Sequence, residues 1–151
     1  MRFKKILATC LVVASMTMTS QAAFAKEGFA DTLHTASEIW LPGYTGTSVN
    51  YTLDSTSDYD FFLANNRYGG SEFIYKLSLQ SPSTANYDVQ LITVDSNNNI
   101  VKTFEVPDSG GSTDVWHDVI QPGHKLYMKV STRGHEYDRN NTYNLIFRKY
   151  G

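Results

Sequence analysis

The feature that most constrains this chain is a series of short runs rich in Tyr, Val, Ile, Phe and Thr, separated by clusters of Gly, Asn, Asp, Ser and Pro. The runs show period-2 alternation, which is typical of strands that bury one face. Even spacing of such runs, with turn residues between them, predicts an all-β sandwich or barrel. The predicted strands are residues 48–53, 58–64, 72–80, 87–95, 100–106, 115–121, 125–132 and 143–149.

The alternation also predicts which side chains face the core. In "EFIYKLSLQ", Phe73, Tyr75, Leu77 and Leu79 point one way and Lys76 points the other. A sheet with one buried face produces this pattern, and antiparallel pairing is its usual setting. In "KLYMKVST" the same reasoning turns three side chains outward: Lys125, Tyr127 and Lys129.

Two segments between runs have clear turn chemistry. "DSNNN" is predicted to be a hairpin tip, because asparagine tolerates the positive φ that such turns need. "QPGHK" is predicted to be a Pro-Gly turn. No repeat or low-complexity linker divides the chain, so the strands are expected to form a single domain.

Residues 1–25 have the composition of a secretory signal peptide. A basic start, "MRFKK", precedes an apolar run, and Ala23-Phe24-Ala25 offers the small-x-small pattern of a cleavage site. A membrane anchor needs about 20 apolar residues, which this segment lacks. We expect a secreted, extracellular protein, cleaved after Ala25 and free of the membrane in its mature form. Cys10 leaves a lipoprotein signal as the alternative, although it lies early, inside the apolar run.

Residues 26–151 are then expected to form one domain, a length that buries about two-thirds of the unfolded surface. Cys10 is the only cysteine of the chain, so the exported part is expected to have no disulfide. Removal of three basic residues leaves 10 Lys and Arg against 15 Asp and Glu, a net charge of −5. This balance disfavours nucleic acid as a partner, since phosphate binding needs clustered positive charge.

The segment "DYDFF" raises the question of a metal or catalytic site. Asp58 and Asp60 share one strand face, with Phe62 beyond them on the same side. The first interpretation is structural: the two carboxylates accept backbone N–H bonds at the start of the strand. The alternative is a calcium site in which Asp54, Asp58 and Asp60 supply hard oxygens, with further oxygens from elsewhere, because calcium takes six to eight.

Catalytic patterns are absent from the sequence. The histidines show no zinc-binding spacing, and no Gly-x-Ser-x-Gly elbow appears. His117 alternates with Val115 and Val119, which predicts a packed histidine, and Trp116 then points the other way and is predicted to be exposed. Trp40 is expected to close one end of the sandwich. We therefore predict that the protein is not an enzyme.

The order of motifs resembles the bacterial pre-peptidase C-terminal domain family, which is related to clostridial collagen-binding modules. The similar segments span nearly all of residues 26–151: "DTLHTASEI", "GTSVNYTLDSTSDYDFF", "GGSEFIYKLSL", "NYDVQLITVDSNNNIV", "PGHKLYMKVST" and "NTYNLIF". The resemblance implies a jelly-roll-like antiparallel β-sandwich of about eight strands. The sequence departs from the family at Asn98, where a turn glycine is common, and it carries no peptidase domain.

The resemblance implies a secreted, non-catalytic binding module for an extracellular protein or polysaccharide polymer, such as a collagen-like matrix, or an accessory to a secreted peptidase. Collagen-binding relatives use an aromatic sheet face, which implies Tyr127 as a contact. If the strand that carries Lys76 lies beside it, a Tyr/Lys patch forms; otherwise Tyr127 simply covers the sheet, with lysine stems alongside. The predicted contacts are Tyr127, Lys125, Lys129, Lys76 and Trp116.

Two other functions stay open from the sequence. One is a calcium-dependent carbohydrate-binding module, which would use the aspartates at 54, 58 and 60. The other is a small hydrolase or a peptidase regulator, which would depend on His117 or His135.

Overall fold

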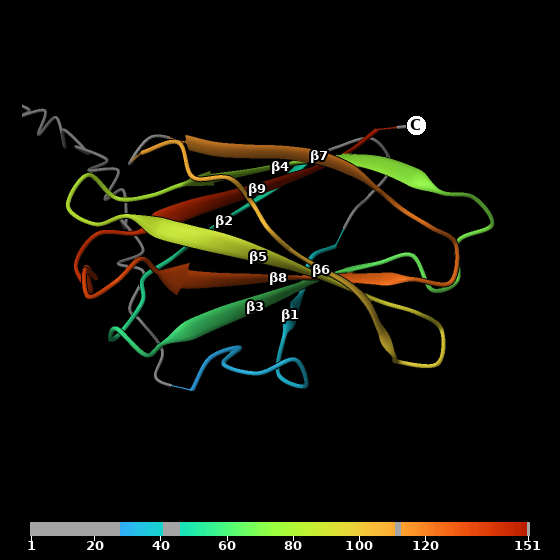
Figure 1. Cartoon of the computed structure of the whole chain (residues 1–151), viewed down its shortest axis with the longest axis horizontal. Coiled ribbons are helices and arrows are strands. Elements are labelled where there is room, and N and C mark those ends of the chain that lie inside the picture. The colour runs from blue at the N-terminus through green and yellow to red at the C-terminus, as the bar shows by residue number, and fades with distance from the viewer. Residues whose placement is uncertain (1–27, 41–45, 111–112, 151) are drawn as a thin grey trace, which may run out of the picture.

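The computed structural model describes residues 28–40, 46–110 and 113–150, and Figure 1 shows the fold. The predicted signal peptide and its cleavage site lie outside these ranges. Within them, the structure contains no helix long and apolar enough to cross a membrane. The strands are β1 (Ser37–Glu38), β2 (Gly46–Tyr51), β3 (Tyr59–Asn65), β4 (Phe73–Gln80), β5 (Tyr87–Val94), β6 (Ile100–Glu105), β7 (Thr113–Ile120), β8 (Lys125–Thr132) and β9 (Tyr143–Tyr150).

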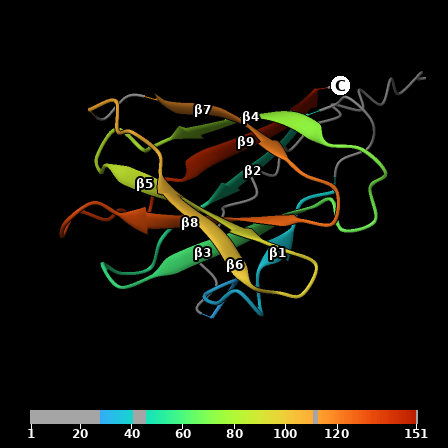
Figure 2. The ribbon, with the colours of Figure 1, turned by 45° about the vertical axis from the view of Figure 1, so that its right-hand side comes forward.

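The strands form two stacked sheets, which Figures 1 and 2 show as two layers. Sheet A has the order β1-β3-β8-β5-β6, and sheet B has the order β2-β9-β4-β7. All neighbours pair antiparallel except β1, which lies parallel to β3. The predicted all-β sandwich is confirmed, and each predicted strand is present with its ends shifted by three residues or fewer.

The core lies between the sheets and is filled mainly by alternate side chains of β3, β4, β5, β8 and β9. In β4 every second residue from Phe73 to Leu79 is buried, as predicted. Tyr75 of β4 stacks on Phe147 of β9 with ring centroids 5.0 Å apart. Aromatic rings in such offset contacts add to the free energy of burial. The core therefore consists of large, specifically packed side chains, which fixes the distance between the sheets.

The outer face of sheet A carries a second, smaller apolar cluster. Phe61, Ile92 and Val94 are buried there, under Leu33 and Ala36 of the N-terminal segment. This segment is attached to the backbone of β3, where Phe61 donates its N–H to the carbonyl of Ala30 at 2.8 Å. The N-terminal segment thus covers part of the outer face of sheet A.

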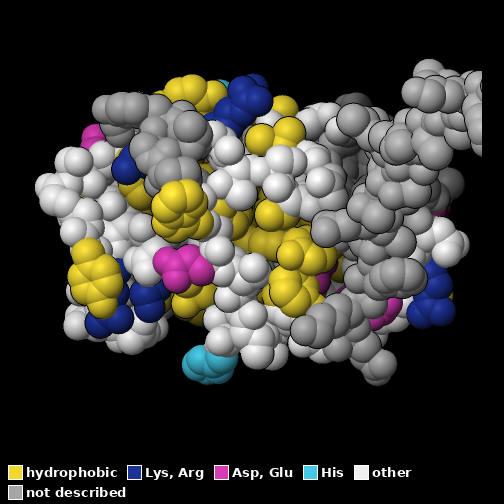
Figure 3. Space-filling view, turned by 180° about the vertical axis from the view of Figure 1, so that it is seen from behind, with side chains coloured by type: hydrophobic (Ala, Val, Ile, Leu, Met, Phe, Trp, Pro, Cys, Tyr) yellow, Lys and Arg dark blue, Asp and Glu magenta, His cyan; other side chains and the backbone are white. Residues whose placement is uncertain are grey.

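The two open sides of the sandwich differ. On the side of β6 and β7, Phe104 packs against Trp116 at 4.3 Å, and Lys102 forms an ion pair with Asp118 at 2.7 Å. The opposite side, formed by β1 and β2, is seen in Figure 3, where hydrophobic side chains show through the middle of the surface. Tyr51 of β2 meets Phe62 of β3 on that side, with centroids 5.8 Å apart.

The turns follow the predicted chemistry. Asn98 has a φ of 64°, and the neighbouring backbone is held by the carboxylate of Asp95, which accepts the N–H groups of Asn97 and Asn99. Asn98 therefore adopts the positive φ for which a turn glycine was expected from the resemblance. Gly123 of the Pro-Gly turn has a φ of 81°, which side chains other than glycine rarely adopt.

Two predictions about tryptophans are wrong. Trp116 is not exposed but packs partly buried against the core, and His117 is exposed rather than packed. The reason is that β7 is an edge strand with apolar residues on both faces, and Val115, taken as an inner residue, is 42% exposed. Trp40 does not close the end of the sandwich, since it is 77% exposed.

Leu77→Ala tests the assignment of the buried face of β4. Leu77 is 1% exposed, so truncation is expected to lower the free energy of unfolding by about 2–5 kcal/mol through lost burial and a cavity. Val115→Ala, on the outer face of the adjoining strand, should change it by less than about 0.5 kcal/mol. Urea denaturation of both variants measures the two values, and equal costs would contradict the assignment.

Candidate functional site

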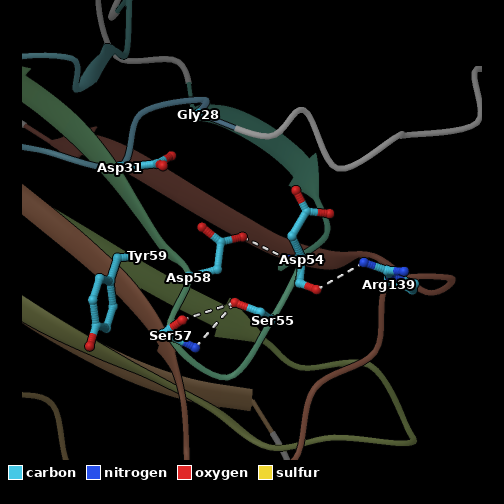
Figure 4. A pocket seen from close by; sticks show the side chains of 8 residues that line it. All are labelled: Gly28, Asp31, Asp54, Ser55, Ser57, Asp58, Tyr59 and Arg139. Atoms are coloured by element: carbon cyan, nitrogen blue, oxygen red, sulfur yellow. Dashed lines mark hydrogen bonds between the residues drawn. The ribbon is translucent and has the colours of Figure 1, made fainter.

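A pocket of about 510 Å³ lies at one end of the sandwich, where the segment "DSTSDY" passes from β2 to β3. Figure 4 shows that its walls come from three separate parts of the chain. Asp54 and Asp58 belong to the loop before β3, Asp31 to the N-terminal segment and Arg139 to the loop between β8 and β9. The remaining lining residues are Gly28, Ser55, Ser57 and Tyr59.

Hydrogen bonds within the pocket show what the carboxylates do for the fold. Asp58 Oδ2 accepts the backbone N–H of Asp54 at 2.6 Å, which closes the loop (Figure 4). Arg139 donates to the carbonyl oxygen of Asp54 at 3.2 Å rather than to a carboxylate. Asp58 therefore has the structural role predicted for it, as an acceptor for backbone N–H at the start of the strand.

Asp60 lies on the inner face of β3, below the pocket. It is 3% exposed and accepts a hydrogen bond from the hydroxyl of Tyr143 on β9. Burial raises the pKa of Asp60 to about 7, against the hydrogen bond from Tyr143, and the negative charges of Asp58, Asp31 and Asp54 add to the rise. The carboxyl group is thus easily protonated in the folded protein and joins the two sheets.

The structure places the three predicted calcium ligands in different environments. Asp54 and Asp58 border the open pocket, whereas the carboxyl group of Asp60 is directed into the core toward Tyr143. A calcium ion held by all three would require Asp60 to leave Tyr143. Calcium binding by Asp54, Asp58 and Asp60 stays a prediction.

A second acidic group was missed in the sequence because its members are far apart in the chain. The carboxylate oxygens of Asp88, Asp108 and Asp114 lie within 4.8 Å of one another. Asp108 forms an ion pair with Arg133, and Asp114 accepts the N–H of Ser109 at 2.7 Å. These partners offset the negative charge and give the group a structural role beside the loop between β6 and β7.

The predicted aromatic surface on β8 is largely engaged within the protein. Tyr127 is half-buried and packs into the cluster on the outer face of sheet A. Lys129 Nζ lies 3.8 Å from the ring centroid of Tyr59, and Lys125 Nζ donates to Asn98 at 3.1 Å. This arrangement matches the interpretation in which Tyr127 covers the sheet. Binding by Tyr127, Lys125 and Lys129 stays a prediction.

Lys76 does not join that surface. β4 belongs to sheet B and β8 to sheet A, and Lys76 projects from the outer face of sheet B. The predicted Tyr/Lys patch therefore does not form, because the order of strands in the sandwich separates its members. Trp116 lies on the inner side of β7, as described above, so it contributes to the core rather than to either outer face.

The outer face of sheet B carries a polar groove of about 530 Å³. It crosses β2, β9 and β4, in which Asn50, Asn144 and Gln80 form one row across the three strands. Asn144 Nδ2 donates to Asn50 Oδ1 at 2.6 Å and to Ser48 Oγ at 2.8 Å, so its amide is held in place. The other lining residues are Ser81, Pro82, Ser83, Asn141, Thr142 and Ile146.

Groups for nucleophilic or acid–base catalysis are not assembled in the part of the chain that the structure describes. There, no histidine nitrogen lies within 4.0 Å of a carboxylate oxygen, so the base and orienting acid of a triad are not paired. His124 instead contacts the carbonyl of Pro122 at 3.0 Å, and His117 is exposed on β7. The described residues thus offer a ligand hydrogen-bonding groups and charged side chains.

Comparison with known proteins finds some solved structures of similar fold at low sequence identity. No family model and no curated protein sequence matches the chain. One similar solved structure is Aeromonas hydrophila PliG, a periplasmic inhibitor of g-type lysozyme, with a TM-score of 0.48 and 8% identity over 76% of this chain and 96% of that one.

Another similar structure is the pre-peptidase C-terminal domain of a Bacillus anthracis collagenase, with a TM-score of 0.45 and 16% identity over 76% of this chain and 94% of that one. A domain of the family that the sequence motifs resemble is thus among the solved structures to which this chain is similar, and the likeness concerns the fold alone. The enzymatically active domain of tailspike protein 4 from bacteriophage CBA120 gives a TM-score of 0.39 at 12% identity, over 70% of this chain and 18% of that one.

Asp60→Asn tests the burial of the carboxyl group through pH. The pKa of Asp60 is raised from 3.8 to about 7 in the folded protein, which therefore binds the proton more tightly than the unfolded chain does. The contribution of Asp60 to the free energy of unfolding is consequently lost as the pH rises from about 4 to about 7. The loss is up to about 4 kcal/mol, at roughly 1.4 kcal/mol per pH unit. Asparagine still accepts the Tyr143 hydroxyl but cannot ionise.

Melting temperatures of the wild type and Asp60→Asn at pH 4.5 and pH 8 measure this effect. We expect the melting temperature of Asp60→Asn to rise relative to that of the wild type as the pH rises. A difference that stays constant with pH would show that Asp60 is not a buried, titrating carboxyl group.

Calcium titration tests the predicted ligand trio. An ion bound to the folded state alone raises the melting temperature in proportion to the logarithm of its concentration. Binding by Asp54, Asp58 and Asp60 therefore predicts a rise that disappears in Asp58→Asn and with chelator. A melting temperature that does not change up to millimolar calcium would refute the predicted calcium site at this end of the sandwich.

Proposed function

We propose that the protein is a secreted, non-catalytic binding module for a hydroxyl-rich extracellular polymer, with the outer face of sheet B as its binding surface. In this proposal the signal peptide is removed after Ala25 and residues 26–151 act as a single domain. The polar groove is the observation that carries the proposal. A module of this kind can act alone or help a secreted peptidase to locate its substrate.

The groove supports this function through its chemistry. Amides and hydroxyls offer both donors and acceptors, which suits the hydroxyl groups of a polysaccharide. Asn50, Asn144 and Gln80 project from adjacent paired strands, so their backbone positions are fixed before a ligand binds. Rigid placement of polar groups reduces the conformational entropy lost on binding.

The openness of the surface also supports binding over catalysis. The groove lies on a sheet face, and the described residues that line it include no histidine, cysteine or acidic side chain that could act as a nucleophile or general acid. A long polymer can pass along such a face without entering a closed cavity. A calcium-dependent carbohydrate-binding module would share this surface and add the acidic pocket as its metal site.

Retention on insoluble polymers tests the proposal. The wild type is expected to bind at least one of chitin, cellulose, peptidoglycan and collagen. In Gln80→Ala/Asn50→Ala, loss of two polar contacts at about 1 kcal/mol each should weaken that binding at least about tenfold. Pull-down isotherms for each polymer measure the change.

The matched control is Gln90→Ala/Asn97→Ala, which removes two amides from sheet A and its hairpin tip. This control should bind as the wild type does. Equal weakening in both double variants, or no retention of the wild type on any of the four polymers, would refute the assignment of the groove.

A further inference from the structure

Two basic side chains lie side by side on the outer face of sheet B. Lys76 of β4 and Arg148 of β9 are directly opposite each other in the antiparallel register. Among the described residues, ion pairs join only Lys102 to Asp118 and Arg133 to Asp108, so neither member of the Lys76/Arg148 pair is neutralised. Like charges directly opposite on neighbouring strands destabilise a sheet. The register thus places two like charges on neighbouring strands, and no described acid forms an ion pair with either of them.

The surrounding chain accommodates this pair. Gly46 of β2 lies opposite Arg148, and a Cβ atom at Gly46 would be 2.5 Å from Arg148 Cγ. Glycine thus leaves room for the stem of the arginine. Lys76 and Arg148, with Ser78 and Ile146, line a depression of about 110 Å³. Ile146 also lines the polar groove, so the two hollows adjoin.

The outer face changes character along the strands. The row of amides at Asn144 is followed, at steps of about 7 Å, by rows at Ile146, Arg148 and Tyr150 on β9. Tyr150 stands opposite Ile74, and the two side chains are 43% and 51% exposed. A ligand lying along β9 would meet amides, then hydroxyl and aliphatic groups, then two cations and finally an aromatic ring.

We infer that the outer face of sheet B binds an acidic polysaccharide, with a carboxylate or sulfate group between Lys76 and Arg148 and sugar hydroxyls in the polar groove. The inference rests on the proposed function and names its class of ligand. Charge complementarity carries it: two cations line one depression and have no ion-pair partner among the described residues, so an anionic group of the ligand matches them. The chain as a whole is acidic, with a net charge of −2, so its general field does not attract polyanions.

An acidic peptide fits this surface less well. The groove lies on the face of sheet B, across β2, β9 and β4, whereas a peptide strand adds at a sheet edge. Of these three strands only β2 has a free edge, so the backbone of the groove floor is not available to a peptide. Most side chains that line the groove are amides and hydroxyls rather than the apolar pockets that hold peptide side chains. A polymer with many hydroxyl groups and regularly spaced anions uses both parts of the face.

Binding of the mature protein, residues 26–151, to a panel of soluble glycans tests the inference. The panel contains polygalacturonate, hyaluronan and dextran sulfate, with methyl-esterified polygalacturonate and dextran as uncharged counterparts. Affinity electrophoresis is expected to show retention on at least one acidic glycan and much weaker retention on the uncharged forms. Lys76→Gln/Arg148→Gln should weaken retention at least tenfold, and the preference for carboxylated or sulfated glycans identifies the anionic group.

Arg67→Gln/Lys149→Gln is the matched control, because it removes the same charge from two residues that line neither the groove nor the depression. It should weaken retention less than twofold. Equal weakening in the two double variants would show non-specific attraction to polyanions and overturn the inference. Retention of polyglutamate as strong as that of the acidic glycans, lost with Lys76 and Arg148, would also overturn it, by assigning the pair to an acidic protein.

The outcomes separate this inference from the proposed function. Retention on a neutral polymer that is lost in Gln80→Ala/Asn50→Ala but kept in Lys76→Gln/Arg148→Gln would overturn the acidic ligand and leave the groove as a binding site. No retention of the wild type on any polymer would refute both. Thermal stability gives a further readout: Lys76→Gln/Arg148→Gln should raise the melting temperature at low salt and not at high salt, whereas a structural role for the pair would lower it.

Discussion

Between the two sheets, Tyr75 stacks on Phe147, and Tyr143 meets Phe62 and Tyr87 edge-on. These rings occupy a layer about 10 Å thick, the usual separation of packed sheets. β3, β4, β5, β8 and β9 give alternate side chains to this layer, so the side chains between them face outward. The two outer faces differ because the N-terminal segment covers part of sheet A. The polar groove and the Lys76/Arg148 pair lie on the outer face of sheet B.

The acidic segment before β3 illustrates how one stretch of sequence serves two purposes. Asp58 completes the hydrogen bonding of a loop, while Asp60, two residues later on the same face, enters the core and meets Tyr143. A buried carboxyl group costs free energy unless it is hydrogen-bonded or protonated. The hydroxyl of Tyr143 and the raised pKa of Asp60 both lower this cost. The carboxyl groups of Asp58 and Asp60 thus each have a structural role in the sandwich.

The strands and most of their faces could be predicted from the sequence, because alternation is a local property. Leu77 and Met128 follow it, since their strands β4 and β8 lie inside a sheet with one face buried. The faces of β7 were assigned the wrong way round, because an edge strand with Val115 outside and Trp116 inside shows no clear polar side. The neighbours of Lys76 could not be predicted, since they depend on the order of strands, which local patterns do not encode.

The ion pair between Lys102 and Asp118 has a consequence for the protein in concentrated solution. β6 and β7 are edge strands, and their unpaired backbone groups could accept a strand from another molecule. Both side chains project toward the gap between the sheets, on the same faces as Phe104 and Trp116. Continuing either sheet into a second molecule would enclose this charged pair away from water. The pair thereby opposes edge-to-edge aggregation.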